Sequence, residues 1–278
     1  MYDPRMRTTQ RRSVSRAAVP AQSIADDILK RLKCLPDRCP NDVFHAGDPA
    51  TPVTGIVVTM TATRAVLAKA AALRANLVIA HEPTFFQDGP LDHLADDPVY
   101  RDKIAFIEAN RLVVWRCHDA THRAKPDVIV AGVTEALGWD KYRSRRDRRI
   151  FDLPATTLGK LVTGVKKSLK LPAVRVTGDP KLAVRRVALS VGCPGWGAHR
   201  KLFREPGIDA ILCGEVREWE TCEYARDTAA TTQPQGLIVL GHLNSEEPGM
   251  AYFARLLTKW FPRIPVHFVP AGDPFWHG

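Results

Sequence analysis

The chain has 278 residues, enough to bury a full hydrophobic core in one large domain or two smaller ones. Hydrophobic residues make up 45% of it and charged residues 25%, ordinary globular proportions that exclude disordered and fibrous proteins. No apolar run approaches the roughly 20 residues that a membrane-spanning helix requires, so we expect no membrane partner.

The formal net charge of +10 is concentrated in two short segments. Residues 1–20 hold five Arg and one Asp, and residues 141–149 hold six basic residues and one Asp. We interpret the first segment as a flexible basic tail of a cytoplasmic protein, with an export-related leader as the alternative. The second is either a solvated linker or a patch that attracts anionic substrates or nucleic acid. Nucleic acid is the less favoured partner, because Tyr142 is the only aromatic residue in this segment.

The six cysteines show neither a Cys-x-x-Cys pair nor the spacing of a small disulfide framework. We therefore expect reduced, mostly buried thiols, which again favours the cytoplasm. A zinc site at Cys34 and Cys39 is disfavoured, because the neighbouring sequence does not clearly offer two further ligands.

The first half of the chain alternates helical and strand patterns. Ser23 and Asp26 resemble a capping arrangement, and apolar residues then recur at helical spacing up to Pro36. Short continuous apolar runs are typical of strands buried on both faces of a parallel sheet. The expected strands are 55–60, 77–80 and 112–115, and the helices between them are 63–75 and 99–109. This order predicts an α/β fold with mostly parallel sheets flanked by helices.

The second half begins at a charged boundary, residues 141–155, which closes on Pro154. The elements expected beyond it are helices at 158–169 and 248–260, a helix that carries Glu215, Glu218, Trp219 and Tyr224, and strands at 184–191, 207–213 and 237–240. They continue the α/β pattern of the first half.

Histidines follow three of the apolar runs within three residues: His81, His118 and His242. In open α/β sheets, ligands bind outside the carboxyl ends of the strands. We therefore expect these three side chains to converge on one cleft at the rim of a parallel sheet. A lone histidine after a strand would more often bond backbone groups, but three at equivalent positions favour a metal site. The histidines without such a context, interpreted as surface or structural, are His45, His93, His199, His267 and His277.

Each of the three histidines has a second potential ligand nearby. In two cases the partner lies four residues further on, so one helical turn places both on one face. In the third it is the adjacent residue, before a proline that lets the chain bend. The resulting set is His81, Glu82, His118 or His122, His242 and Glu246. These mixed donors suit zinc, iron, manganese or nickel and are numerous enough for two ions bridged by water. Asp119 either orients a ligating histidine or caps the turn.

These motifs resemble those of the NIF-three-like family, also known as dinuclear-metal-centre hexameric proteins and as GTP cyclohydrolase I type 2 homologues. The likeness covers nearly all of the chain after about residue 20. The segments that carry it are VTGIVVTMTAT (53–63), ANLVIAHEPTFF (75–86), RLVVWRCHDATH (111–122), GIDAILCGEVREWE (207–220) and GHLNSEE (241–247).

The resemblance implies a definite set of metal ligands. The family's motifs are His-His-Pro, His-x-x-x-Asp and His-x-x-x-Glu, which read here as His81-Glu82-Pro83, His118-x-x-x-His122 and His242-x-x-x-Glu246. Glu82 thus stands where the family has His, and His122 stands where it has Asp. One imidazole and one carboxylate have exchanged places, which keeps the formal charge and favours a retained metal centre. The implied ligands are His81, Glu82, His122, His242 and Glu246, with His118 outside the direct ligands.

The resemblance also implies a two-lobed α/β subunit that assembles into a toroidal homohexamer with the metal sites facing an internal cavity. After the tail of residues 1–20, the metal-binding lobe is expected from residues 21–140 and 236–278. The second lobe is expected from residues 141–235.

Two functional hypotheses follow. The first is a metal-dependent hydrolase that holds two divalent ions (Zn, Fe or Mn) and acts on a small anionic nucleotide or phosphoester. Its candidate catalytic residues are Glu246, which would hold the bridge between the ions with Glu82 as the alternative, and Asp119, which would shuttle a proton. Glu215 either faces the substrate or caps a helix. The second hypothesis is a non-catalytic protein whose metal cluster serves metal storage, stability or partner binding.

Overall fold

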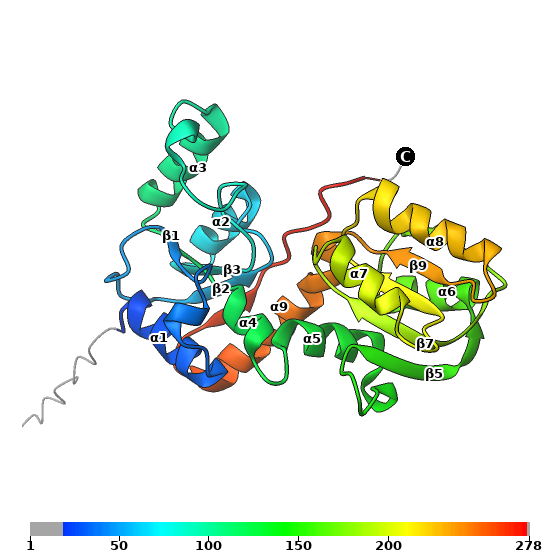
Figure 1. Cartoon of the computed structure of the whole chain (residues 1–278). Coiled ribbons are helices and arrows are strands. Elements are labelled where there is room, and N and C mark those ends of the chain that lie inside the picture. The colour runs from blue at the N-terminus through cyan, green and yellow to red at the C-terminus, as the bar shows by residue number, and fades with distance from the viewer. Residues whose placement is uncertain (1–18, 277–278) are drawn as a thin grey trace, which may run out of the picture.

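The computed structural model describes residues 19–276, which form two five-stranded sheets flanked by helices (Figure 1). In the first sheet the strand order is β1-β4-β3-β2-β10, and all neighbours run parallel except β1, which pairs antiparallel with β4. Its strands are β1 (Phe44–Ala46), β2 (Ile56–Thr59), β3 (Leu77–Ala80), β4 (Val113–Arg116) and β10 (Val266–Phe268).

The second sheet has the order β5-β7-β8-β9-β6, with a parallel centre and one antiparallel strand at each edge. Its strands are β5 (Ile150–Thr157), β6 (Arg175–Thr177), β7 (Ala183–Ser190), β8 (Ala210–Cys213) and β9 (Gly236–Val239). The predicted fold class, α/β with mostly parallel sheets flanked by helices, is confirmed.

The α-helices are α1 (Ala21–Leu32), α2 (Arg64–Ala72), α3 (Pro98–Ala109), α4 (Asp119–Arg123), α5 (Val128–Leu137), α6 (Leu158–Leu169), α7 (Trp196–Phe203), α8 (Glu223–Asp227) and α9 (His242–Trp260). Short 3-10 turns lie at Pro36–Arg38, Asp92–Leu94, Asp140–Tyr142 and Thr228–Ala230, and a π-helical turn at Glu218–Cys222. Among the described helices, none combines the length and apolar character needed to cross a bilayer.

Several helix boundaries differ from the predictions. The Ser23–Asp26 cap was wrong: α1 begins earlier, after Pro20, without a side-chain cap, and ends at Lys33 in the left-handed region rather than at Pro36. Helix α9 begins six residues before the expected start and contains Pro248 in its interior. A proline removes one helical N–H bond but does not by itself prevent a helix from continuing. The predicted start of the helix around Glu215 was also wrong, because that residue lies in a loop before the π-helical turn.

Strand β5 was missed, and the reason lies in its geometry. Its sequence contains Pro154, which cannot donate to a sheet ladder and suggests a break. The strand accommodates it because β5 lies at the sheet edge and its register with β7 shifts between Asp152 and Thr156. The charged segment expected as a boundary therefore leads straight into the second sheet.

Two further expectations need correction. Strand β9, which we had placed in the metal-binding lobe, pairs with β8 and β6 in the second sheet. Cys34 and Cys39 form a disulfide across the Pro36–Arg38 turn, so the expectation of six reduced thiols was wrong for this pair. The other four cysteines are free thiols, and of these Cys117 and Cys213 are buried. The N-terminal tail falls almost entirely outside the described residues. Apart from the position of β9, the lobe boundaries stay a prediction.

Helices α5 and α9 lie between the two sheets (Figure 1). Helix α5 places Val128 and Ile129 in the core of the first sheet and Val133 in the core of the second. The two helices cross where Gly132 faces Gly249: a Cβ atom on Gly132 would lie 2.6 Å from the Gly249 Cα. This backbone approach excludes any larger side chain at the crossing.

Replacing either glycine by alanine therefore forces the helices apart. We expect Gly132→Ala or Gly249→Ala to lower the free energy of unfolding by about 1–3 kcal/mol, the usual cost of overpacking a core. The measurement is a chemical denaturation curve. Gly164→Ala in α6 is the matched control: its Cβ meets nothing within 4 Å, so it should gain about 0.5–1 kcal/mol from helix propensity. Equal effects at all three positions would contradict the close crossing.

Candidate metal centre

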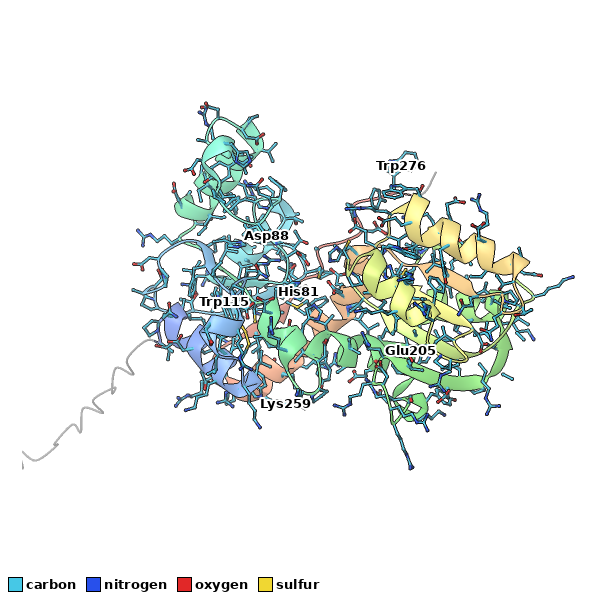
Figure 2. The ribbon with its side chains drawn as sticks, in the orientation of Figure 1. His81, Asp88, Trp115, Glu205, Lys259 and Trp276 are labelled. Atoms are coloured by element: carbon cyan, nitrogen blue, oxygen red, sulfur yellow. A yellow bond between two sulfur atoms is a disulfide. The ribbon has the colours of Figure 1, made fainter. Side chains whose placement is uncertain are left out.

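Three strands end at the same place, but they come from both sheets. His81 follows β3 and His118 lies two residues after β4 in the first sheet, whereas His242 follows β9 of the second. Figure 2 shows His81 on the side of the first sheet that faces the second. The predicted convergence is thus confirmed, while the expectation of a single sheet rim was wrong. The cluster lies between two sheets.

Two helices add the remaining donors. Helix α4 carries His122, and its first turn is fixed by Asp42, whose carboxylate accepts the backbone N–H groups of His118, Asp119 and Ala120 at 2.7–2.9 Å. Helix α9 carries Glu246 one turn after His242. The four-residue spacings therefore act as predicted, each presenting two donors on one helical face.

Glu246 lies at the centre of the cluster. Its side chain is 2% exposed, and His81 beside it is 0% exposed. One carboxylate oxygen, Oε2, lies 3.4 Å from His81 Nε2 and 3.2 Å from His242 Nε2. The other, Oε1, lies 3.5 Å from His122 Nε2. One buried carboxylate thus faces three imidazoles from both sheets.

Glu82 provides a second carboxylate next to the same ring nitrogen of His242. Its Oε1 lies 3.2 Å from His242 Nε2 and 3.9 Å from His118 Nε2. Its Oε2 lies 3.4 Å from the guanidinium of Arg116, which is itself buried and donates to the His81 carbonyl at 3.0 Å. Arg116 therefore fixes both the Glu82 side chain and the backbone at His81.

An outer carboxylate holds each of three imidazoles at Nδ1. Asp127 lies 3.2 Å from His122, Asp119 lies 3.1 Å from His118, and Glu215 lies 3.1 Å from His242. An ionised carboxylate only accepts hydrogen bonds, so each Nδ1 carries the proton and each Nε2 turns toward the centre. This arrangement is typical of histidines that bind metal ions.

The charges of the cluster are strongly coupled. Burial alone would raise the pKa of Glu246, but the imidazoles of His122, His242 and His81 hold it far below its usual range. Burial opposes the charged form of His242, yet Glu246 and Glu82 raise its pKa to about 11. Against the same desolvation, Asp127 and Glu246 raise the pKa of His122 to about 10. The cluster without metal therefore holds protons that a cation would replace.

The donor atoms fit a metal ion. Both ring nitrogens of His81 and the Oε2 atom of Glu246 are buried and make no hydrogen bond, which is costly unless another partner is bound. Two groups of donors each converge within 4.8 Å: His81 with His118 and His122, and His81 with Glu82 and Glu246. Four of the predicted ligands lie in these groups, and so does His118, which we expected outside the direct ligands. The fifth, His242, belongs to neither group but lies 3.2 Å from both Glu82 and Glu246.

The loop after β7 closes the cluster from the second sheet. Gly192 has φ +66°, and a Cβ there would lie 2.5 Å from Glu246 Oε1. Its N–H donates to Ser245 Oγ at 2.9 Å, and Ser245 in turn donates to the His242 carbonyl. Sequence reasoning missed Gly192, Arg116 and Asp127. The strand-end rule that found the histidines would have found Gly192 as well.

A cavity of about 360 Å³ adjoins the cluster through Glu215. Helix α7 contributes Trp196 and the fully buried His199, and the loops contribute the exposed thiol of Cys193 and the guanidinium of Arg217. Its volume lies at the lower end of the roughly 300–1,000 Å³ range of small-molecule sites. Glu215, 54% exposed, faces both this cavity and His242.

Fold and site together define a class of protein: an α/β protein whose two sheets enclose a histidine–carboxylate cluster suited to divalent metal. The sequence profile of the family described as Duf34/NIF3 (NGG1p interacting factor 3) matches residues 41–274. The chain belongs to this family.

The comparisons with individual proteins agree with this assignment. The chain is 24% identical over 215 residues to a GTP cyclohydrolase 1 type 2 homolog of Clostridium perfringens, covering 73% of this chain and 77% of that one. Its fold is similar to a hypothetical protein of Staphylococcus aureus (TM-score 0.77, 16% identity, 94% and 100% coverage). It also resembles the protein ybgI, of unknown function (TM-score 0.74, 23% identity, 92% and 100% coverage). A Bacillus cereus protein related to NIF3 gives a TM-score of 0.73 at 16% identity, with 94% and 99% coverage.

The outer carboxylates make a testable contribution to metal binding. Asp127→Asn removes the charge that orients His122, whereas the amide can still cap α5 by accepting the Val130 N–H. We expect metal affinity to fall about 10–100-fold, the usual effect of losing such a partner, with little change in stability. The measurement is metal competition against a chelator. Asp140→Asn, at an exposed carboxylate near α5, is the control; equal losses in both variants would contradict the role of Asp127.

Proposed function

We propose that the chain holds two divalent metal ions in this cluster and uses them to hydrolyse a small anionic substrate. The observation that supports this most is the pair of donor groups that share His81. A set of four imidazoles and two carboxylates exceeds what one tetrahedral ion requires. Mixed nitrogen and oxygen donors suit zinc, iron or manganese.

Within this proposal each residue has a stated task. Glu246, central among three imidazoles, would be the main carboxylate that holds the metal ions. Asp119 had been a candidate proton shuttle, but its oxygens accept from the Asn41 side chain and backbone and face His118. We now assign Asp119 to the orientation of His118. A divalent ion bound here would supply Lewis-acid chemistry and lower the pKa of a water molecule toward about 7.

The substrate would occupy the cavity beside Glu215. This carboxylate borders both the cavity and His242, which makes it the best-placed group to accept or return a proton. Arg217 provides a positive charge for an anionic substrate, although it also lies 3.3 Å from Glu220. The Clostridium relative is named for a GTP cyclohydrolase, so nucleotides are the first substrates to test, followed by phosphoesters.

The assembly and location are proposed on the family resemblance. A homohexamer in the cytoplasm would place the clusters around an internal cavity. Light scattering of the purified chain gives the number of subunits directly. The Cys34–Cys39 disulfide is unusual for a reducing compartment, so a thiol assay of protein purified under native conditions is the matching test of location.

The decisive variant is His242→Ala. It removes the imidazole that lies 3.2 Å from both Glu82 and Glu246, and we expect loss of at least one ion per chain and of all metal-dependent turnover. The fold should survive, because only the first turn of α9 is affected. Mass spectrometry measures the metal content, and a panel of nucleotides and phosphoesters measures turnover. Circular dichroism shows whether the fold survives.

His93→Ala, in the exposed turn at Asp92–Leu94, is the matched control and should keep both metal and turnover. If the wild-type protein binds two ions but turns over nothing in the panel, the non-catalytic hypothesis of metal storage or partner binding replaces hydrolysis. If the wild-type protein binds no divalent ion at all, the hydrolase hypothesis and the non-catalytic metal-binding hypothesis are both wrong.

A further inference from the structure

The basic segment at 141–149 forms a defined cavity instead of a solvated linker. The chain between η3 at Asp140–Tyr142 and β5 folds back on itself, with the Ser144 N–H donating to the Ile150 carbonyl and the Ile150 N–H to the Asp147 carbonyl. A cavity of about 360 Å³ lies against the start of α5. Its charged lining consists of four arginines and two carboxylates: Arg143, Arg146, Arg148, Arg149, Asp127 and Asp147.

Two of the four arginines are fixed by their neighbours. Arg143 lies over the buried ring of Phe151 at 5.3 Å and donates to the Arg148 carbonyl at 2.9 Å. Arg149 makes a forked pair with Asp147, at 3.2 Å from Nε and 2.9 Å from Nη2. Arginines held in this way lose little side-chain freedom when an anion binds.

The other two arginines supply uncompensated charge. Among the described residues, Arg146 and Arg148 form no ion pair, and both side chains are exposed. The two carboxylates of the cavity are already engaged: Asp147 pairs with Arg149, and Asp127 faces His122. The cavity therefore has an excess of positive charge with free N–H donors, the chemistry that recognises phosphate oxygens.

We propose that this cavity binds the phosphate or pyrophosphate group of a small molecule. Its volume is that of a small-ligand site, and guanidinium groups match phosphate in geometry as well as charge. The site is separate from the metal cluster but adjacent to it, because Asp127 lines the cavity and also orients His122. The proposal concerns binding and does not depend on hydrolysis.

A nucleic acid is the other polyanion to consider, and the site favours it less. Proteins that bind single strands combine positive charge with aromatic rings on which bases stack. Tyr142 is the only aromatic residue in the segment, and its ring already lies 5.0 Å from the Lys141 ammonium. Among the described residues that line the cavity, none has an aromatic side chain.

The test is calorimetric titration of the full chain, stripped of metal, with inorganic pyrophosphate. Removing the metal prevents pyrophosphate from binding through the cluster and eliminates turnover, so failure here is independent of the proposed hydrolysis. Arg146→Ser/Arg148→Ser should weaken binding at least about tenfold, because each guanidinium donates charge-assisted hydrogen bonds. Both positions are exposed, so the thermal midpoint should not change.

Arg200→Ser/Arg204→Ser is the matched control, since it removes two exposed arginines, one in α7 and one directly after it, that line neither cavity. It should retain wild-type affinity. Absence of pyrophosphate binding by the wild type, or an equal loss in the control, would overturn the proposal. A third result would also overturn it: a single-stranded oligonucleotide binds through Arg146 and Arg148, and pyrophosphate does not bind. That result would assign the surface to nucleic acid.

Discussion

The buried carboxylate of Glu246 is the group on which the arrangement of this protein depends. An ionised carboxylate removed from water is strongly unfavourable unless charged or hydrogen-bonding partners replace the lost hydration. Here the replacement is the set of imidazoles from His81, His122 and His242, which reach it from a strand end, a short helix and its own helix. Folding must therefore bring both sheets together around one side chain, and a divalent cation would complete what the imidazoles begin.

The packing between the sheets explains how such a site is held. Helix α9 carries Glu246 and crosses α5 at the Gly132–Gly249 contact, while the loop just before α5 carries Asp127, the partner of His122. The crossing thus sets the distance between two parts of the cluster. From the other side, Gly192 leaves no space beside Glu246 for a side chain. Metal donors that are fixed before the ion arrives require less rearrangement on binding.

Much of the fold and of the candidate metal site was predictable, because the most informative sequence patterns involve residues that are close together in the chain. Continuous apolar runs indicate buried parallel strands, and β3 and β4 lie within a residue of their expected bounds. The histidine positions followed from a general property of α/β sheets, the location of ligands at strand ends. Four-residue spacing then identified His122 and Glu246 as partners.

The features that could not be predicted depend on contacts between segments that are far apart in the sequence. Nothing near β9 in the sequence indicates which sheet it joins, because any buried parallel strand has the same apolar pattern. Pro154 and Pro248 suggested breaks, whereas an edge register shift and a long helix accommodate them. The Cys34–Cys39 disulfide depends on the turn between the two residues, which the spacing alone did not reveal. Asp127 was missed because it lies five residues after His122, outside the helical spacing used to find partners.

The two departures from the family motifs have a physical explanation in the outer contacts of this chain. A carboxylate at Glu82, where the resemblance expects an imidazole, needs a positive partner, and the buried guanidinium of Arg116 provides one at 3.4 Å. An imidazole at His122, where the resemblance expects a carboxylate, needs an acceptor at Nδ1, and Asp127 provides it at 3.2 Å. Each exchanged donor is therefore matched by a group of opposite charge just outside the cluster. Both partners also have structural contacts of their own, since Asp127 accepts the Val130 N–H and Arg116 donates to the His81 carbonyl. The exchange is therefore accommodated by contacts already present in the fold, and the number of imidazole and carboxylate donors available for a metal ion is unchanged.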